Sequence, residues 1–154
     1  MVADPLADPR FLEGLRLARR REWFTAHDVW EELWRETDPG EPRELIQGLI
    51  QQVVALEHLQ RGNPMGAFNV WNKARAKLAK LDPWCGGVGI GPWGEAIAAF
   101  YTEVNLGDRV RLLLEGGVAA DELGPREGRA ELPPLPGPEG WPVPPLTAEL
   151  EARL

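Results

Sequence analysis

The stretch HDVWEELW, residues 27–34, carries the strongest indication of how this chain folds. On a helix of 3.6 residues per turn, His27, Trp30, Glu31 and Trp34 follow one face. Tryptophan favours burial, whereas histidine and glutamate favour it only when they have polar partners. This face therefore predicts either a polar network inside a helical core or a binding site on the helix.

Helical periodicity continues on both sides of this stretch, and glycine, proline and asparagine punctuate it. Asp8 and Pro9 have the residue types of an N-cap and a first helical position. The connections between the helical segments are short, which favours antiparallel neighbours. We therefore expect an all-α fold, a compact antiparallel bundle with four core helices. Their ranges are 9–20, about 22–37, about 42–61 and about 64–81.

The pattern changes after residue 81. A glycine-rich loop over 82–92 precedes one or two further helices, at about 93–103 and about 107–115, which Gly116 and Gly117 close. From residue 124 the chain is rich in proline, which favours polyproline-like or irregular structure. Apolar residues in this stretch indicate that it wraps over the core or over a partner chain. A short helix at 147–153, capped by Thr147, ends it. We thus divide the chain into a helical bundle domain, 1–123, and a C-terminal extension, 124–154.

Composition limits the function. The 154 residues carry a net charge of −7, which argues against nucleic-acid binding, since such proteins present basic surfaces. One cysteine excludes an internal disulfide framework and a multi-cysteine zinc site, while seven tryptophans indicate an aromatic core. No signal peptide and no membrane span are apparent, so the expected location is the cytoplasm. The remaining candidate partners are a small molecule or a protein. The protein itself is expected to be a monomer or a homodimer.

Two helices contribute polar side chains at helical spacing. His27 and Glu31 are four residues apart, and Gln47, Gln51 and His58 follow at steps of four and seven on the next helix. We expect the antiparallel hairpin to bring these groups together beside Trp30 and Trp34. Three interpretations remain: a structural network that fixes helix register, a pocket for a small ligand or peptide, or a catalytic or metal site.

The metal interpretation has the least support. His27, Glu31 and His58 would supply three ligands with an open position. However, the chain has two histidines in all, which excludes a three-histidine site, and the motif differs from the His-Glu-x-x-His of zinc proteases. We therefore expect no metal and no cofactor. The alternative is a small metal-assisted or acid/base hydrolase-like enzyme that uses Glu31, His27 and His58, so the sequence leaves enzymatic activity open.

A family resemblance rests on combined motifs in the first half of the chain. The motif over residues 27–34 is followed by LIQGLIQ at 45–51, RGN at 61–63 and Ala67. This pattern resembles a bacterial and archaeal family known as domain of unknown function 309, over about residues 10–81. Asp28 stands where that family usually has glutamate, whereas the residues that match its motifs are retained. These are His27, Glu31, Trp34, Gln47 and Gln51. The resemblance implies a compact all-α bundle and implies no activity.

Overall fold

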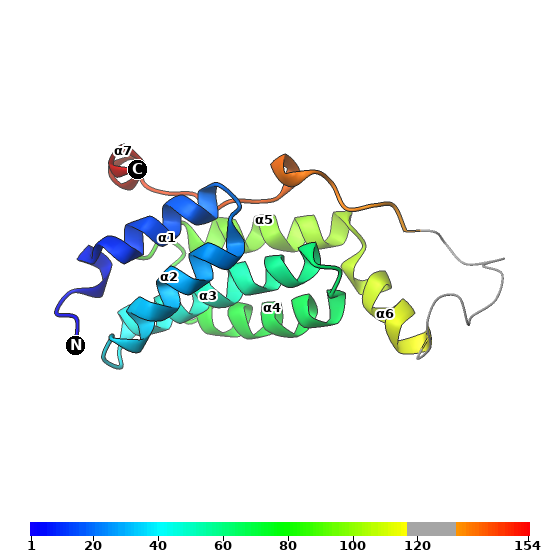
Figure 1. Cartoon of the computed structure of the whole chain (residues 1–154), viewed down its shortest axis with the longest axis horizontal. Helices are drawn as coiled ribbons and strands as arrows, with labels where there is room; N and C mark the ends of the chain where they lie inside the picture. Colours follow the sequence, from blue (N-terminus) through cyan, green and yellow to red (C-terminus); the bar gives the residue numbers. More distant parts are fainter. Residues whose placement is uncertain (117–131) are drawn as a thin grey trace.

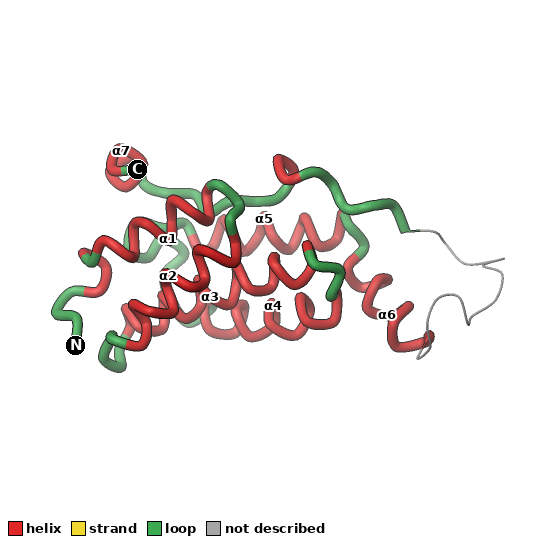
Figure 2. Tube along the Cα trace, viewed as in Figure 1, coloured by secondary structure: helices red, strands yellow, loops and turns green. Residues whose placement is uncertain are grey.

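The structure, a computed structural model, describes residues 1–116 and 132–154, and these residues form α-helices without a β-strand (Figures 1 and 2). The all-α expectation is therefore confirmed. The expected closure of the sixth helix at Gly117 and the start of the extension at residue 124 lie outside the described residues. The helices are α1 (Pro9–Arg19), α2 (Trp23–Arg35), α3 (Glu41–Gln60), α4 (Pro64–Leu78), α5 (Ile90–Glu103), α6 (Leu106–Gly116) and α7 (Ala148–Arg153).

Helices α1 to α4 pack in chain order, each mainly against the next (Figure 1). Helix α5 completes the core with Trp93 and Ile97, which are fully buried. It begins at Ile90, three residues earlier than the periodicity predicts. The reason is that Pro92 lies in the first turn, where a backbone N–H would have no helical partner in any case. None of the described helices is long and apolar enough to cross a membrane.

The contact between α1 and α2 depends on a tryptophan and a glycine. Trp30 is fully buried, and its Nε1 donates a hydrogen bond of 3.1 Å to the carbonyl oxygen of Phe11. A Cβ atom on Gly14 would lie 1.9 Å from that same nitrogen. The absence of a side chain at Gly14 is thus what lets the indole reach the α1 backbone.

Charged side chains reinforce the same helix pair close to Phe11, at the start of α1. Asp8 caps α1, since its side chain accepts a hydrogen bond of 2.9 Å from the Arg10 backbone N–H. The Arg10 guanidinium bonds Asp8 in turn, and this holds the pKa of the Asp8 carboxyl below its usual value. Arg10 also contacts Glu32 and Glu36 on α2.

The described part of the C-terminal extension, 132–154, lies along α1 and α5 (Figures 1 and 2). Trp141 is buried with its ring 4.8 Å from that of Phe100, and its carbonyl oxygen accepts a 2.9 Å hydrogen bond from Arg21. Trp93 donates to the carbonyl oxygen of Pro142 at 3.2 Å. Further on, Thr147 caps α7 through the Leu150 N–H. The extension therefore packs against its own chain at these points.

The glycine at the α1–α2 contact provides a stability test. We expect Gly14→Ala to cost about 3 kcal/mol, because the new methyl group displaces the Trp30 indole and breaks its hydrogen bond. Gly94→Ala is the matched control, since a Cβ at this helical position meets no atom within 4 Å. It should gain about 0.5–1 kcal/mol from helix propensity. Urea unfolding measures both, and equal effects would contradict this packing.

Candidate functional site

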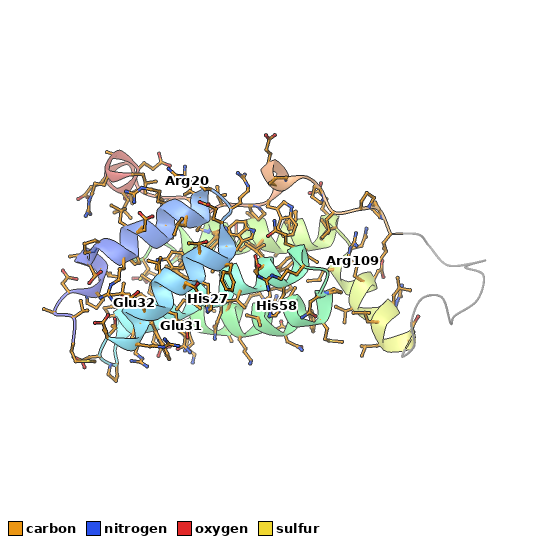
Figure 3. All side chains as sticks on the ribbon, viewed as in Figure 1. Arg20, His27, Glu31, Glu32, His58 and Arg109 are labelled. Atoms are coloured by element: carbon orange, nitrogen blue, oxygen red, sulfur yellow. The ribbon has the colours of Figure 1, made fainter. Side chains whose placement is uncertain are left out.

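Helix α2 exposes the face opposite to its core contacts. Its buried residues are Trp23, Ala26, Trp30 and Leu33, at helical spacing. The burial of these four side chains sets the rotation of the helix about its axis. As a result His27 and Glu31 lie at the surface of the bundle, where Figure 3 shows them next to each other on α2.

His27 and Glu31 form the centre of a short chain of polar contacts. His27 Nε2 lies 2.8 Å from Glu31 Oε2, and Arg35 Nη2 donates to Glu31 Oε1 at 2.6 Å. His27 Nδ1 lies 3.5 Å from Asp28 Oδ1. The His27 and Glu31 side chains retain 27% and 31% of their exposure. The pair is therefore ordered by its neighbours and is open to solvent.

Phe24 was not among the residues singled out from the sequence, yet it borders this pair. Its side chain is 50% exposed, which is high for a large aromatic residue. Its ring lies 6.2 Å from that of His27, and the Arg61 guanidinium lies 5.3 Å from its centroid. Its position, three residues before His27, is the signal that places it on this face. We call Phe24, His27, Glu31 and Arg61 the His27 surface.

The two tryptophans of the motif have different surroundings. Trp30 is buried against α1 and takes no part in the exposed pair. Trp34 is half-buried, and the Arg43 guanidinium lies 4.2 Å above its ring. The Trp34 indole N–H is buried and has no hydrogen-bond partner among the described residues. Trp34 thus adds a cation–π contact between α2 and the first turn of α3.

The polar residues of α3 do not close into the expected network. Gln47 and Gln51 are half-buried, and the Gln51 side-chain oxygen has no partner in the described part of the chain. His58 instead joins the turn before α4, where its Nδ1 lies 3.1 Å from Asn63 Nδ2. Asn63 in turn caps α4 by accepting from the Gly66 N–H. His58 therefore has a local structural role at the α3–α4 turn, further along the bundle than His27 (Figure 3).

The candidate metal ligands are not arranged as a preformed site in the described part of the chain. Within residues 1–116 and 132–154, no three histidine, cysteine, aspartate or glutamate side chains are grouped so as to hold a metal ion. His27, Glu31 and His58 accordingly do not come together as a ligand triad. Of these three residues, His27 and Glu31 are in contact with each other.

The single thiol is not activated. Cys85 is buried, and its Sγ lies 3.7 Å from Glu41 Oε1. Burial, followed by the neighbouring Glu41 carboxylate, raises the pKa of the Cys85 thiol. A nucleophilic cysteine needs the opposite shift, so Cys85 is a packing residue of the loop before α5.

The charge around the His27 surface is mostly negative. Residues 22–36 carry five acidic side chains and one basic side chain. Arg10 offsets part of this charge at Glu32 and Glu36, and Arg61 pairs with Glu57 at 2.5 Å. The result is an exposed phenyl ring beside a net acidic helix face.

Comparison with known proteins places most of these residues in one family segment. Residues 11–70 match the model of a family described as "Domain of unknown function (DUF309)", which confirms the resemblance found in the sequence. The chain is 29% identical over 83 residues to an uncharacterized protein of Aquifex aeolicus (strain VF5), covering 54% of this chain and 24% of that protein. It is 40% identical over 47 residues to the uncharacterized protein YpuF of Bacillus subtilis (strain 168), covering 30% and 27% respectively.

The chain therefore spans about a quarter of the length of the curated relatives that it matches. No solved structure matches it. The matched segment contains the whole of the His27 surface as well as Trp30, Trp34, Gln47, Gln51 and His58.

The partial exposure of His27 allows a test of whether the residue has a structural role. We expect His27→Ala to change the free energy of unfolding by less than about 1 kcal/mol, because the pair is half-buried and keeps contact with solvent, which screens its attraction. Asp28→Ala, on the same turn with a 58% exposed side chain, is the matched control. Thermal and urea unfolding measure both variants. A loss of about 1–3 kcal/mol for His27→Ala alone would indicate a sealed structural network instead.

Proposed function

We propose, starting from the match of residues 11–70 to a family without an assigned function, that the protein is a non-enzymatic binding module. Its His27 surface recognises a basic segment of a partner protein. The observation that carries the proposal is Phe24, a half-exposed ring held between His27 and Arg61 at the edge of an acidic helix face. Aromatic and arginine side chains supply much of the binding energy at protein interfaces.

Order at the surface supports this function. Glu31 is held by His27 and Arg35 from opposite sides along the helix, and Arg61 is held by Glu57. Side chains that are already fixed lose less entropy when a partner binds. The core contacts of α2 hold the helix itself, so the surface is largely formed before binding.

Charge determines the class of partner. The excess of acidic side chains over residues 22–36 attracts lysine and arginine and repels acidic segments. Phe24 requires an apolar side chain among those basic residues. We therefore expect a segment with both features, and we expect it to meet the protein in the cytoplasm. The partner protein, rather than a second copy of this acidic chain, is the proposed occupant.

The enzymatic alternative assigns acid/base work to the His27–Glu31 pair. A contact of 2.8 Å suits proton exchange between an imidazole and a carboxylate. Both Glu31 oxygens, however, already have cationic or imidazole partners, which favours a positioning role for this carboxylate. The binding module therefore accounts for more of the observed contacts.

A phage-displayed library of random peptides tests the proposal, because it offers the protein many candidate partner segments at once. We expect selection on the wild-type protein to enrich basic peptides that contain an apolar residue. Phe24→Ala should weaken their binding at least about tenfold, as loss of an interface hot spot does. Phe68→Ala is the matched control, because Phe68 is a second exposed phenylalanine, on α4 and outside the His27 surface. Titration calorimetry gives the dissociation constants.

Three outcomes would overturn this function. They are acidic or uncharged peptides after selection, equal losses in the two phenylalanine variants, and no enrichment over an unrelated acidic protein. A dependence on Phe24 that Phe68 does not share supports it, since neither substitution alters the charge of the protein.

A further inference from the structure

The described part of the C-terminal extension contacts the rest of the protein mainly as a hydrogen-bond acceptor. Residues 132–147 include seven prolines, which have no backbone N–H, so their carbonyl oxygens are the polar groups left for recognition. At Gly137, Trp141 and Thr147 the backbone has polyproline II angles, with φ between −61° and −85° and ψ between 136° and 166°. The segment thus lies along α1 and α5 much as an extended peptide does (Figure 1).

The rest of the protein provides a row of donors for the carbonyl oxygens of this segment. The donors come from the α1–α2 turn, from the loop before α5 and from α5 itself. Donor first, the bonds include Arg21 Nε to Trp141 at 2.9 Å, Arg21 Nη2 to Glu139 at 3.1 Å, the Gly89 N–H to Pro145 at 2.8 Å and Trp93 Nε1 to Pro142 at 3.2 Å. These bonds depend on the course of the segment's backbone and on none of its side chains.

Arg21 has a backbone conformation that arginine rarely adopts. Its φ is +61°, in the left-handed region, two residues after the end of α1, where glycine is the usual residue. An arginine at this position costs free energy relative to glycine, because its Cβ crowds the backbone. Its side chain is the one that donates twice to the extension. Recognition of the extension therefore accounts for an arginine at a position that favours glycine.

A single aromatic side chain anchors the segment. Trp141 is 3% exposed, and its ring lies 4.8 Å from that of Phe100. The residues before it, 136–140, are exposed, and they turn so that Trp141 Nε1 donates to the Pro136 carbonyl oxygen at 3.1 Å. A buried aromatic anchor beside a polyproline II backbone is also how partner peptides are recognised at protein surfaces. The residues that contact this segment, which we call the extension face, are Arg21, Gly89, Trp93 and Phe100.

We propose that the extension face is a recognition site for proline-rich segments, which the chain's own residues 132–147 occupy. A proline-rich segment of a partner protein that contains a Trp-Pro pair replaces them, since it presents the same carbonyl oxygens and the same indole. Because residues 132–147 belong to the same chain, they compete with the partner at a high effective concentration. The extension face shares no residue with the His27 surface, so either proposal stands if the other fails.

A labelled peptide of residues 132–147 tests this site in the full chain once the chain's own anchor is weakened. Trp141→Ala removes the buried ring, so the extension leaves the face and the Trp93 indole N–H loses its acceptor, which moves its NMR signal. By fluorescence anisotropy, we expect the peptide to bind this variant at least about tenfold more tightly than the wild type. Binding should also return the Trp93 signal toward its wild-type position.

Two controls separate this binding from other effects. Trp84→Ala, at a 49% exposed tryptophan outside the extension face, should bind the peptide as weakly as the wild type. The peptide contains no lysine or arginine, so the His27 surface is not expected to bind it. Helical circular dichroism of each variant shows that the bundle is folded.

Changes on each side of the contact locate the binding. A peptide with alanine in place of Trp141 should bind the Trp141→Ala protein at least about tenfold more weakly, as loss of a hot spot does. Arg21→Gly removes two donors and suits the left-handed backbone, so its addition to Trp141→Ala should weaken the peptide's binding to a similar extent. Arg20→Ala, at the exposed neighbouring arginine, is the matched control and should leave binding unchanged.

The Trp93 signal also reports whether the extension has left the face. Where Trp141→Ala leaves this signal in place, Leu146→Ala is added, because Leu146 is a second buried anchor with 7% exposure. The proposal is overturned if the signal stays in place in the double variant, since the face then does not exchange its occupant. It is equally overturned if a released variant does not bind the peptide, if the wild type binds it as tightly, or if the alanine-substituted peptide binds equally well.

Discussion

The fold depends on the hydrogen bond from the Trp30 indole to the Phe11 carbonyl oxygen across the gap left by Gly14. A hydrogen-bond partner stabilises a buried indole N–H, and a helical backbone rarely supplies one because its carbonyls are already engaged. Phe11 lies in the first turn of α1, the helix that also includes Gly14. The indole of Trp30 therefore approaches α1 over Gly14 and donates to the Phe11 carbonyl oxygen. The contact sets how closely α1 and α2 approach, and together with the burial of Trp23, Ala26 and Leu33 it sets the rotation of α2.

That rotation has a direct consequence for the surface. With Trp23, Ala26, Trp30 and Leu33 turned inward, helical geometry turns Phe24, His27 and Glu31 outward. The i, i+4 ladder from His27 through Glu31 to Arg35 then forms within α2 alone. Partner recognition at the His27 surface is thus inferred from residues whose orientation the core determines.

Interactions between residues that are close in the sequence predicted much of this arrangement. The helices, the Asp8 and Thr147 caps and the His27–Glu31 contact all depend on residues within about four positions of one another. The expected grouping of His27 with Gln51 and His58 depends on how two helices pack. His58 instead contacts a residue that is closer to it in the sequence. His58 meets Asn63 five residues away, and the Gln51 oxygen meets no partner among the described residues. Phe24 was missed because the exposure of a side chain is a property of the packed chain.

Hydrogen exchange of the tryptophan indole N–H groups, followed by NMR, tests the orientation of α2 most directly. The Trp30 signal, assigned by its loss in Trp30→Phe, should exchange far more slowly than that of Trp84, whose side chain is 49% exposed. Slow exchange places the Trp30 indole inside the α1–α2 contact, with the His27 surface turned outward. Exchange of Trp30 as fast as that of Trp84 would contradict the inward orientation, and with it the basis of the proposed binding surface.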